Sequence, residues 1–215
     1  MESGYPEWAG LACSNAKQYS HFVADSCCFA GWIDGAIDCT DIAGNTPLYS
    51  TLFLIRDKLQ QSGLKLVLAE SCTAGLVAAE LGKVPGISEF FCGSMVVYQS
   101  RTKTAWLNIA PDGLEDPQRG PVSQWASSSL ADNLLERTPH ASVAFAVTGH
   151  LGPGAPQGLD GVVFGSFRTR TRERDEVRIE LRAPAPSHSQ DYERREARQR
   201  EATLRFLEWI ARKLS

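Results

Sequence analysis

Two short apolar segments, each followed by a polar turn, constrain the fold of this chain more than any other feature. Residues 64–69 and 141–147 consist almost entirely of apolar and small side chains, a composition typical of strands that are buried on both faces. Each segment runs into a turn rich in hydroxyl or glycine residues, at 70–75 and 148–155. Because open α/β sheets bind ligands in the loops that follow their strands, these two turns are the predicted functional site.

Segments with helical periodicity separate the predicted strands. Apolar residues recur every three or four positions from Leu48 to Leu59 and from Ala202 to Leu214, as in amphipathic helices. The predicted helices are residues 47–62, 76–81, 102–107, 123–136 and 191–214, and the further predicted strands are 90–98, 161–169 and 176–181. The last two strands are expected to form a hairpin across the charged turn 170–175. This order predicts an α/β fold, a three-layer α/β/α sandwich around a mixed β-sheet.

The first 46 residues differ in character from the rest. They are rich in Gly, Ser, Cys and aromatic residues without a sustained period, and a turn and helix-start signal follows at Gly44-Asn45-Thr46-Pro47. We therefore expect an irregular N-terminal extension at 1–46, whose function the sequence does not indicate, and one domain at 47–215. A chain of 215 residues is long enough for one substantial core with an appendage.

Charge and hydropathy argue against several classes of function. The net charge of −3 lacks the basic excess of a nucleic-acid-binding surface, and the arginines at 194–200 are interspersed with glutamates, which predicts a solvated helix face. No apolar run is long enough to span a bilayer and the N terminus has no signal-like pattern, so we expect a cytoplasmic protein without a membrane partner. The six cysteines show no metal-ligand spacing, so we expect them to be reduced and no metal to be bound.

The turn at 70–75 combines hydroxyl groups with the start of a helix. Such a turn exposes backbone N–H groups and the positive end of the helix dipole, which suits an oxyanion or a phosphate. A second interpretation is that Ser71 or Thr73 simply caps the helix with its side chain.

Four segments, in this order and spacing, resemble the CinA carboxy-terminal family: residues 69–76, 97–103, 120–123 and 146–154. The resemblance covers residues 48 to 214 and implies a nicotinamide mononucleotide deamidase of pyridine nucleotide salvage, which hydrolyses a linear amide without a cofactor. It also implies a homodimer. Members of this family often carry a separate nucleotide pyrophosphatase domain, and we expect none here because the 46 preceding residues are too few.

The resemblance implies that Ser71 is the nucleophile and Lys103 its base. A serine hydroxyl needs a base to take its proton, and a lysine serves only when its pKa is lowered, for example by burial. Backbone N–H groups at Cys72 or Thr73 would stabilise the tetrahedral oxyanion. The implied substrate-binding residues are Cys72, Thr73, Gly75, Tyr98, Thr148, Gly149, Gly152 and Gly154.

Other interpretations of these residues stay open at this point. Cys72 is a second candidate nucleophile, although a cysteine beside a strand end is more often a small buried hydrophobe. Without the resemblance, Lys103 would be read as a surface lysine and Tyr98 equally as a structural residue. His150 stands where the family usually has an apolar residue, and we expect a loop position, not a general base.

The sequence departs from the family pattern at three places. Ala74-Gly75 replaces a glycine pair, Val162 replaces a threonine, and Gln190-Asp191-Tyr192 replaces Gly-Asp-Arg. If that arginine normally meets the substrate phosphate, either Arg194 or Arg195 must substitute for it or the substrate has changed. Two alternatives therefore accompany the deamidase prediction: a catalytically silent nucleotide-binding module, and an amidase for another small carboxamide.

Overall fold

A computed structural model describes residues 46–182 and 191–214. By its internal contacts the chain divides into Met1–Gly44 and Asn45–Ser215, and the described residues belong to the second unit. The predicted extension at 1–46 therefore falls, apart from Thr46, outside the described residues.

Five strands form one mixed sheet in the order β2-β1-β3-β4-β5. Their bounds are β1 Leu66–Glu70, β2 Phe91–Val96, β3 Val143–Gly149, β4 Val162–Thr169 and β5 Arg174–Glu180. Strand β1 runs parallel to β2 and to β3, so the ends of these three strands lie at one edge of the sheet. Strands β4 and β5 continue the sheet antiparallel, as the predicted hairpin.

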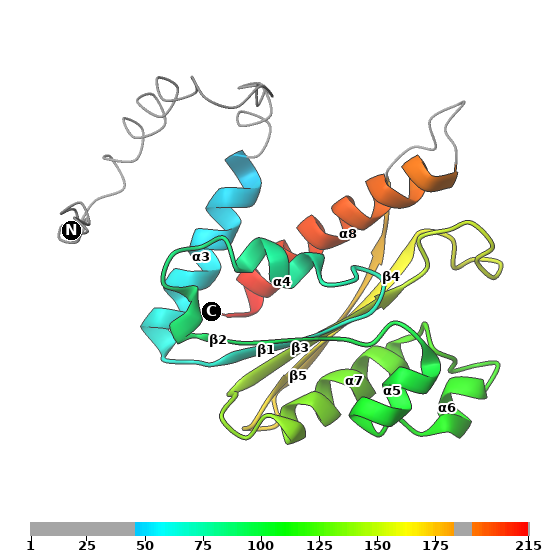
Figure 1. Ribbon diagram of the computed structural model, residues 1–215, viewed down its shortest axis with the longest axis horizontal. Coiled ribbons are helices and arrows are strands. Elements are labelled where there is room, and N and C mark those ends of the chain that lie inside the picture. The colour runs from blue at the N-terminus through cyan, green and yellow to red at the C-terminus, as the bar shows by residue number, and fades with distance from the viewer. Residues whose placement is uncertain (1–45, 183–190, 215) are drawn as a thin grey trace, which may run out of the picture. The chain divides into compact units, whose positions relative to one another are not determined.

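Helices cover both faces of the sheet, which confirms the predicted three-layer α/β/α arrangement (Figure 1). One layer holds α3 Thr46–Ser62, α4 Leu76–Leu81 and α8 Asp191–Lys213. The opposite layer holds α5 Ser100–Leu107, α6 Pro111–Glu115 and α7 Gln124–Arg137. A short 3-10 turn, η2 Ile87–Glu89, precedes β2.

The central strands are buried from both sides, which explains their apolar composition. Along β1, Leu66 and Leu68 pack in the core beneath α3 and α8, whereas Val67 and Ala69 pack in the core beneath α7. Phe145 of β3 lies edge-to-face with Trp209 of α8, with ring centroids 5.3 Å apart. The alternation of side chains along a strand therefore builds two separate cores from one sheet.

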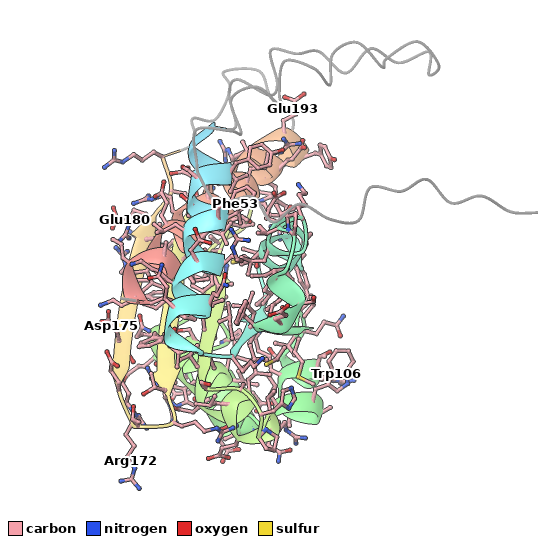
Figure 2. The ribbon with its side chains drawn as sticks, turned by 90° about the vertical axis from the view of Figure 1, so that its left-hand side faces the viewer. Phe53, Trp106, Arg172, Asp175, Glu180 and Glu193 are labelled. Atoms are coloured by element: carbon pink, nitrogen blue, oxygen red, sulfur yellow. The ribbon has the colours of Figure 1, made fainter. Side chains whose placement is uncertain are left out.

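The outer strand β5 is charged. Figure 2 shows Asp175 and Glu180 along this strand and Arg172 at the hairpin turn beside it. Its side chains are exposed or half-buried except for Ile179. Charged residues on an edge strand disfavour pairing with another sheet.

The structure differs from the predicted elements mainly at their ends. Strand β1 extends one residue further than predicted, to Glu70, and β3 extends two residues further, to Gly149, because the polar groups of Glu70 and Thr148 are hydrogen-bonded inside the protein. Helix α6 and turn η2 were not predicted. None of the helices in the described ranges is both long and apolar enough to cross a membrane.

Candidate active site

The two predicted turns meet at the edge of the sheet where β1, β2 and β3 end. The Ser71 N–H donates to the Val147 carbonyl at 3.0 Å, and the Val97 N–H donates to the Glu70 carbonyl at 2.8 Å. The first turn, residues 71–75, is thereby held between the ends of the neighbouring strands. The structure thus brings the candidate nucleophile beside the segment that leads to Lys103.

Ser71 and Lys103 are in direct contact. Lys103 lies one turn into α5, and its Nζ donates to the Ser71 Oγ at 3.0 Å and to the Tyr98 carbonyl at 3.4 Å. Both side chains are shielded from water: Ser71 is 6% exposed and Lys103 is 2% exposed. Within the described ranges no carboxylate contacts the Lys103 Nζ. Lys103 is therefore not the surface lysine that its sequence position alone would indicate.

Burial makes Lys103 a potential base. Loss of water around the ammonium lowers its pKa to about 8, because burial disfavours the charged form. At pH 7 roughly a tenth of the molecules then carry the neutral amine, which can accept a proton. The Ser71 hydroxyl is the group placed to give it one.

The Cys72 thiol has the opposite electrostatic setting. Burial raises its pKa to about 12, and the charge of Glu70 adds to the rise. A thiol of this kind stays protonated at neutral pH, and the thiolate is the reactive form of cysteine. The geometry therefore favours Ser71 over Cys72 as the nucleophile.

The backbone N–H groups of the turn are candidate oxyanion donors. Among the described residues, neither the Cys72 N–H nor the Thr73 N–H donates to a backbone carbonyl, and the Cys72 N–H lies beside its own thiol. Both groups are available to a developing oxyanion. The N–H groups at the start of α4 are not available in the same way, because another group already occupies them.

Glu70 occupies that helix N-terminus. Its carboxylate accepts hydrogen bonds from the N–H groups of Gly75, Val77 and Ala78 at 3.0, 3.1 and 3.0 Å. Neither Ser71 nor Thr73 caps the helix with its side chain, so the capping interpretation is wrong. Sequence reasoning missed Glu70; its one signal is a carboxylate placed directly after a buried strand.

Ala74 marks the departure from the usual glycine pair. Its φ is 52°, in the left-handed region, whereas Gly75 follows with a φ of 94°. An alanine in this region is strained by about 1 kcal/mol relative to glycine. The turn therefore keeps the conformation that the glycine pair would adopt more easily.

The second turn contributes shape more than free polar groups. Thr148 is buried and its hydroxyl donates to the Pro121 carbonyl at 3.1 Å. Gly149 has no room for a side chain, since a Cβ would lie 2.7 Å from Val163 Cγ2. Gly154 is exposed, with open space beside its Cα. His150 lies directly after β3, as expected, and burial lowers its pKa, which favours the neutral ring.

Helix α8 reaches over both turns. Arg195 donates to the Gly152 carbonyl at 2.7 Å and to the Tyr98 hydroxyl at 2.5 Å. One helical turn further, Gln199 Nε2 donates to the carbonyls of Cys72 and Thr73 at 3.3 and 3.2 Å. Sequence reasoning offered Arg195 as one of two substitutes for the missing arginine and did not identify Gln199.

Arg195 differs from the other arginines on this helix. Arg198 pairs with Asp160 and Arg200 pairs with Glu196, whereas the described residues place no carboxylate in contact with Arg195. The prediction of a solvated face at 194–200 is therefore correct for Arg200, which is 74% exposed, and wrong for Arg198, which is 11% exposed. Of the three positions that replace Gly-Asp-Arg, Gln190 lies outside the described residues and Tyr192 is exposed.

No group of three or more potential metal ligands occurs within the described ranges. In the described part of the chain the arrangement consists of a serine, a buried lysine, two N–H groups that donate to no backbone carbonyl, and a guanidinium without a carboxylate partner. This set can deliver a nucleophile, accept its proton, stabilise an oxyanion and hold an anionic group.

Comparison with known proteins matches most of this chain to one family. The family model described as the CinA C-terminal domain matches residues 48–209. A CinA-like protein of Myxococcus xanthus is 35% identical over 113 residues, which are 52% of this chain and 26% of that protein. A CinA-like protein of Akkermansia muciniphila is 42% identical over 96 residues, 45% of this chain and 22% of that protein. The matched segments thus span about a quarter of these relatives.

Solved structures share the fold. A competence/damage inducible protein of Agrobacterium tumefaciens has a TM-score of 0.66 and 26% identity, over 78% of this chain and 95% of that one. A competence or damage-inducible protein of Enterobacter asburiae also has a TM-score of 0.66, with 24% identity over 77% of this chain and 96% of that one. The similarity covers nearly the whole of both solved chains.

Proposed function

This chain belongs to the CinA C-terminal domain family, and from that premise we propose that it hydrolyses the carboxamide of nicotinamide mononucleotide to nicotinate mononucleotide and ammonia. The observation that carries the proposal is the hydrogen bond of 3.0 Å between Lys103 Nζ and Ser71 Oγ inside the protein. A serine activated by a neutral lysine is a known type of acyl-transfer centre. The resemblance to nicotinamide mononucleotide deamidases supplies the substrate.

In the proposed first step, the neutral Lys103 amine accepts the Ser71 proton while Ser71 Oγ attacks the carboxamide carbon. The N–H groups of Cys72 and Thr73 donate to the oxyanion, a contribution on the order of 3 kcal/mol per donor. Collapse of the tetrahedral intermediate breaks the C–N bond, and the Lys103 ammonium returns the proton to the leaving nitrogen. Ammonia leaves and an acyl ester remains on Ser71.

In the second step, water attacks the ester carbonyl. Lys103 again accepts a proton, this time from the water, and then gives it to Ser71 Oγ as the ester bond breaks. Nicotinate mononucleotide is released and the dyad is restored. No metal and no organic cofactor enters either step.

Arg195 supports a substrate that carries an anion. Its guanidinium contacts two neutral oxygens, one from the second turn and one from Tyr98. A phosphate could therefore neutralise the positive charge of the guanidinium and accept two hydrogen bonds from it. We therefore assign phosphate binding to Arg195 in place of the arginine missing from 190–192. Tyr98, which is 52% exposed, would lie at the entrance.

The proposed enzyme acts in the cytoplasm as a homodimer on a small molecule, with neither nucleic acid nor membrane as a partner. The free thiols of Cys72 and Cys92 fit a reducing compartment. The dimer is proposed on the family resemblance alone.

The experiment that tests the function is product analysis with three substrates. Purified full-length protein is incubated with nicotinamide mononucleotide, nicotinamide riboside or nicotinamide, and ammonia and the acid product are quantified. The proposal predicts release of ammonia and nicotinate mononucleotide, with much slower turnover of the two substrates that lack phosphate. Equal turnover of the riboside would indicate an amidase for other carboxamides. Binding of the mononucleotide without ammonia release would indicate a silent binding module.

A further inference from the structure

Glu70 is a buried carboxylate directly before the proposed nucleophile, and the mechanism above gives it no role. It is 0% exposed, and no lysine or arginine of the described residues forms an ion pair with it. Its oxygens accept five hydrogen bonds instead. The donors are the N–H groups of Gly75, Val77 and Ala78 and the hydroxyls of Thr73 and Ser94.

These bonds explain how a carboxylate remains buried at this place. An isolated buried charge is strongly unfavourable, but hydrogen bonds to the charged form offset its lost hydration. Three of the five donors belong to the start of α4, where the helix dipole also favours an anion. Glu70 therefore joins the end of β1 to α4 and, through Ser94, to β2.

The turn between these anchor points carries the reacting groups. The Ser71 N–H is held by Val147, while Glu70 holds the hydroxyl of Thr73 and the N–H of Gly75. Gln199 binds the Cys72 and Thr73 carbonyls from the other side. Because C=O and N–H point in opposite directions across a trans peptide, holding the Cys72 carbonyl also orients the Thr73 N–H.

We propose that Glu70 is a positioning residue that holds Ser71 and the two oxyanion donors in their reactive arrangement. Glu70 exchanges no proton with the substrate: its carboxylate contacts neither Ser71 Oγ nor Lys103 Nζ among the hydrogen bonds of the site. It acts through the turn. This inference deepens the proposed function and rests on it, but its structural part can be tested separately.

The first test is Glu70→Gln. The amide keeps one acceptor oxygen but turns an NH₂ group toward donors, so the turn loses part of its anchor. We expect kcat to fall about 10²-fold, the size of effect that a small misplacement of reacting groups produces. KM should change much less than kcat, because Arg195 on α8 is proposed to bind the phosphate, and the pH profile of kcat/KM should keep its midpoint, because Glu70 makes no hydrogen bond to Lys103.

The matched control is Glu80→Gln. It makes the same chemical change in the same helix, where Glu80, whose side chain is 14% exposed, pairs with the exposed Lys83. Because this pair makes no hydrogen bond to residues 71–75 in the described chain, kcat should stay within about twofold of the wild type. An unchanged kcat in Glu70→Gln would overturn the proposal. A shifted pH midpoint would also overturn it, since the carboxylate would then act on Lys103 directly and not through the turn.

Ser94→Ala is a second, milder change that tests the positioning role of Glu70 even if Glu70→Gln fails to fold. It removes one donor to the carboxylate at 2.9 Å and leaves the charge in place. We expect kcat to fall about three- to tenfold, and no further loss when the change is added to Glu70→Gln, because the hydroxyl acts only through the carboxylate. An unchanged kcat in Ser94→Ala, or additive losses in the double variant, would contradict the proposal.

Alkylation of Cys72 tests the positioning without any amidase activity. Folded protein is treated with iodoacetamide and the modification of Cys72 is followed by peptide mass spectrometry. The thiol is 4% exposed in the intact turn, so Glu70→Gln should raise its rate at least about tenfold through local opening, while Glu80→Gln should not. If the wild type releases no ammonia but this rate rises, the proposed function fails and the positioning role stands. An unchanged rate in folded Glu70→Gln overturns the positioning role.

Discussion

The reactivity proposed for Ser71 depends on the solvation of one lysine. Lys103 is almost fully buried and its pKa is lowered to about 8 by loss of hydration. Burial leaves part of the amine neutral at pH 7 and therefore able to accept a proton, and its Nζ lies 3.0 Å from the hydroxyl that it must deprotonate. Two consequences can be measured, one in the rate and one in stability.

The rate should depend on pH through this lysine. The neutral amine is the active form, so kcat/KM for nicotinamide mononucleotide should rise with pH and reach half its plateau near pH 8, where the Lys103 pKa lies. Measurements from pH 7 to pH 10 avoid the second ionisation of the substrate phosphate, near pH 6. A flat or falling profile in this range would exclude Lys103 as the base.

Replacing Lys103 should change activity and stability in opposite directions. Lys103→Met removes a buried charge from a side chain of similar length, so the variant should lose activity yet gain about 2 kcal/mol in free energy of unfolding at pH 7. Lys103 releases its proton near pH 8 in the folded state but at about 10.5 when unfolded. The wild type therefore gains stability as the pH rises through this window, and the advantage of the variant should shrink. Denaturant titrations at pH 7 and pH 10 measure both; a less stable variant would contradict the account.

At the scale of elements, α8 completes a site that two strand ends begin. Arg195 and Gln199 lie one turn apart on this helix and contact the second and the first turn respectively. The helix therefore links the proposed phosphate-binding group to the turn that holds the proposed nucleophile. A change at Arg195 should affect binding of the anion more than chemistry.

Arg195→Gln should raise KM for nicotinamide mononucleotide by about 10- to 100-fold, because a charge-assisted pair to the phosphate is lost. Turnover of nicotinamide riboside, which has no phosphate, should be unchanged. Arg200→Gln is the matched control, since Arg200 is 74% exposed and pairs with Glu196. An equal loss with both substrates would mean that Arg195 serves the fold and not the phosphate.

The sequence predicted the helices and strands that have a clear apolar pattern and missed those that depend on contacts with distant residues. Long apolar periods identified α3, α7 and α8, and the buried runs identified β1 and β3. Helix α6 contains only one large apolar residue and forms where Gly113 packs under Trp125; a Cβ there would lie 2.0 Å from the ring. No local pattern encodes such a contact.

The candidate site likewise contains residues that the sequence predicted and residues that it did not. Ser71 and Lys103 were found through the family pattern, and the structure brings them together. The partners of Gln199 are set by tertiary folding, since it contacts residues more than a hundred positions away. Glu70 contacts Ser94 of a neighbouring strand in the same way, although its other partners are close in sequence. Burial was also misjudged for Arg198, because charge alternation indicates a surface helix even where the loop between β3 and β4 covers the side chain.

At the scale of the whole molecule, the described unit contains every residue that the mechanism uses. Ser71, Lys103 and Arg195 all lie within Asn45–Ser215. The apolar cores on both faces of the sheet are likewise built from residues of this unit. The first 46 residues should therefore be dispensable for catalysis.

A truncated protein that begins at Asn45 tests this. We expect its thermal midpoint to lie within a few degrees of the full chain, because the cores stay complete, and its deamidation rate to be the same within about twofold. Thermal denaturation and ammonia release from both proteins provide the comparison. Loss of folding or of turnover would show that the N-terminal residues complete the core or the site.

The central claim is that Ser71 and Lys103 act as one catalytic unit on nicotinamide mononucleotide. The most direct measurement is the initial rate of ammonia release by Ser71→Ala, Lys103→Ala, the double variant and Cys72→Ala. The account predicts a loss of about 10³-fold or more in each single variant, no further loss in the double variant, and most of the activity kept in Cys72→Ala. Near-normal turnover by Ser71→Ala together with an inactive Cys72→Ala would contradict it.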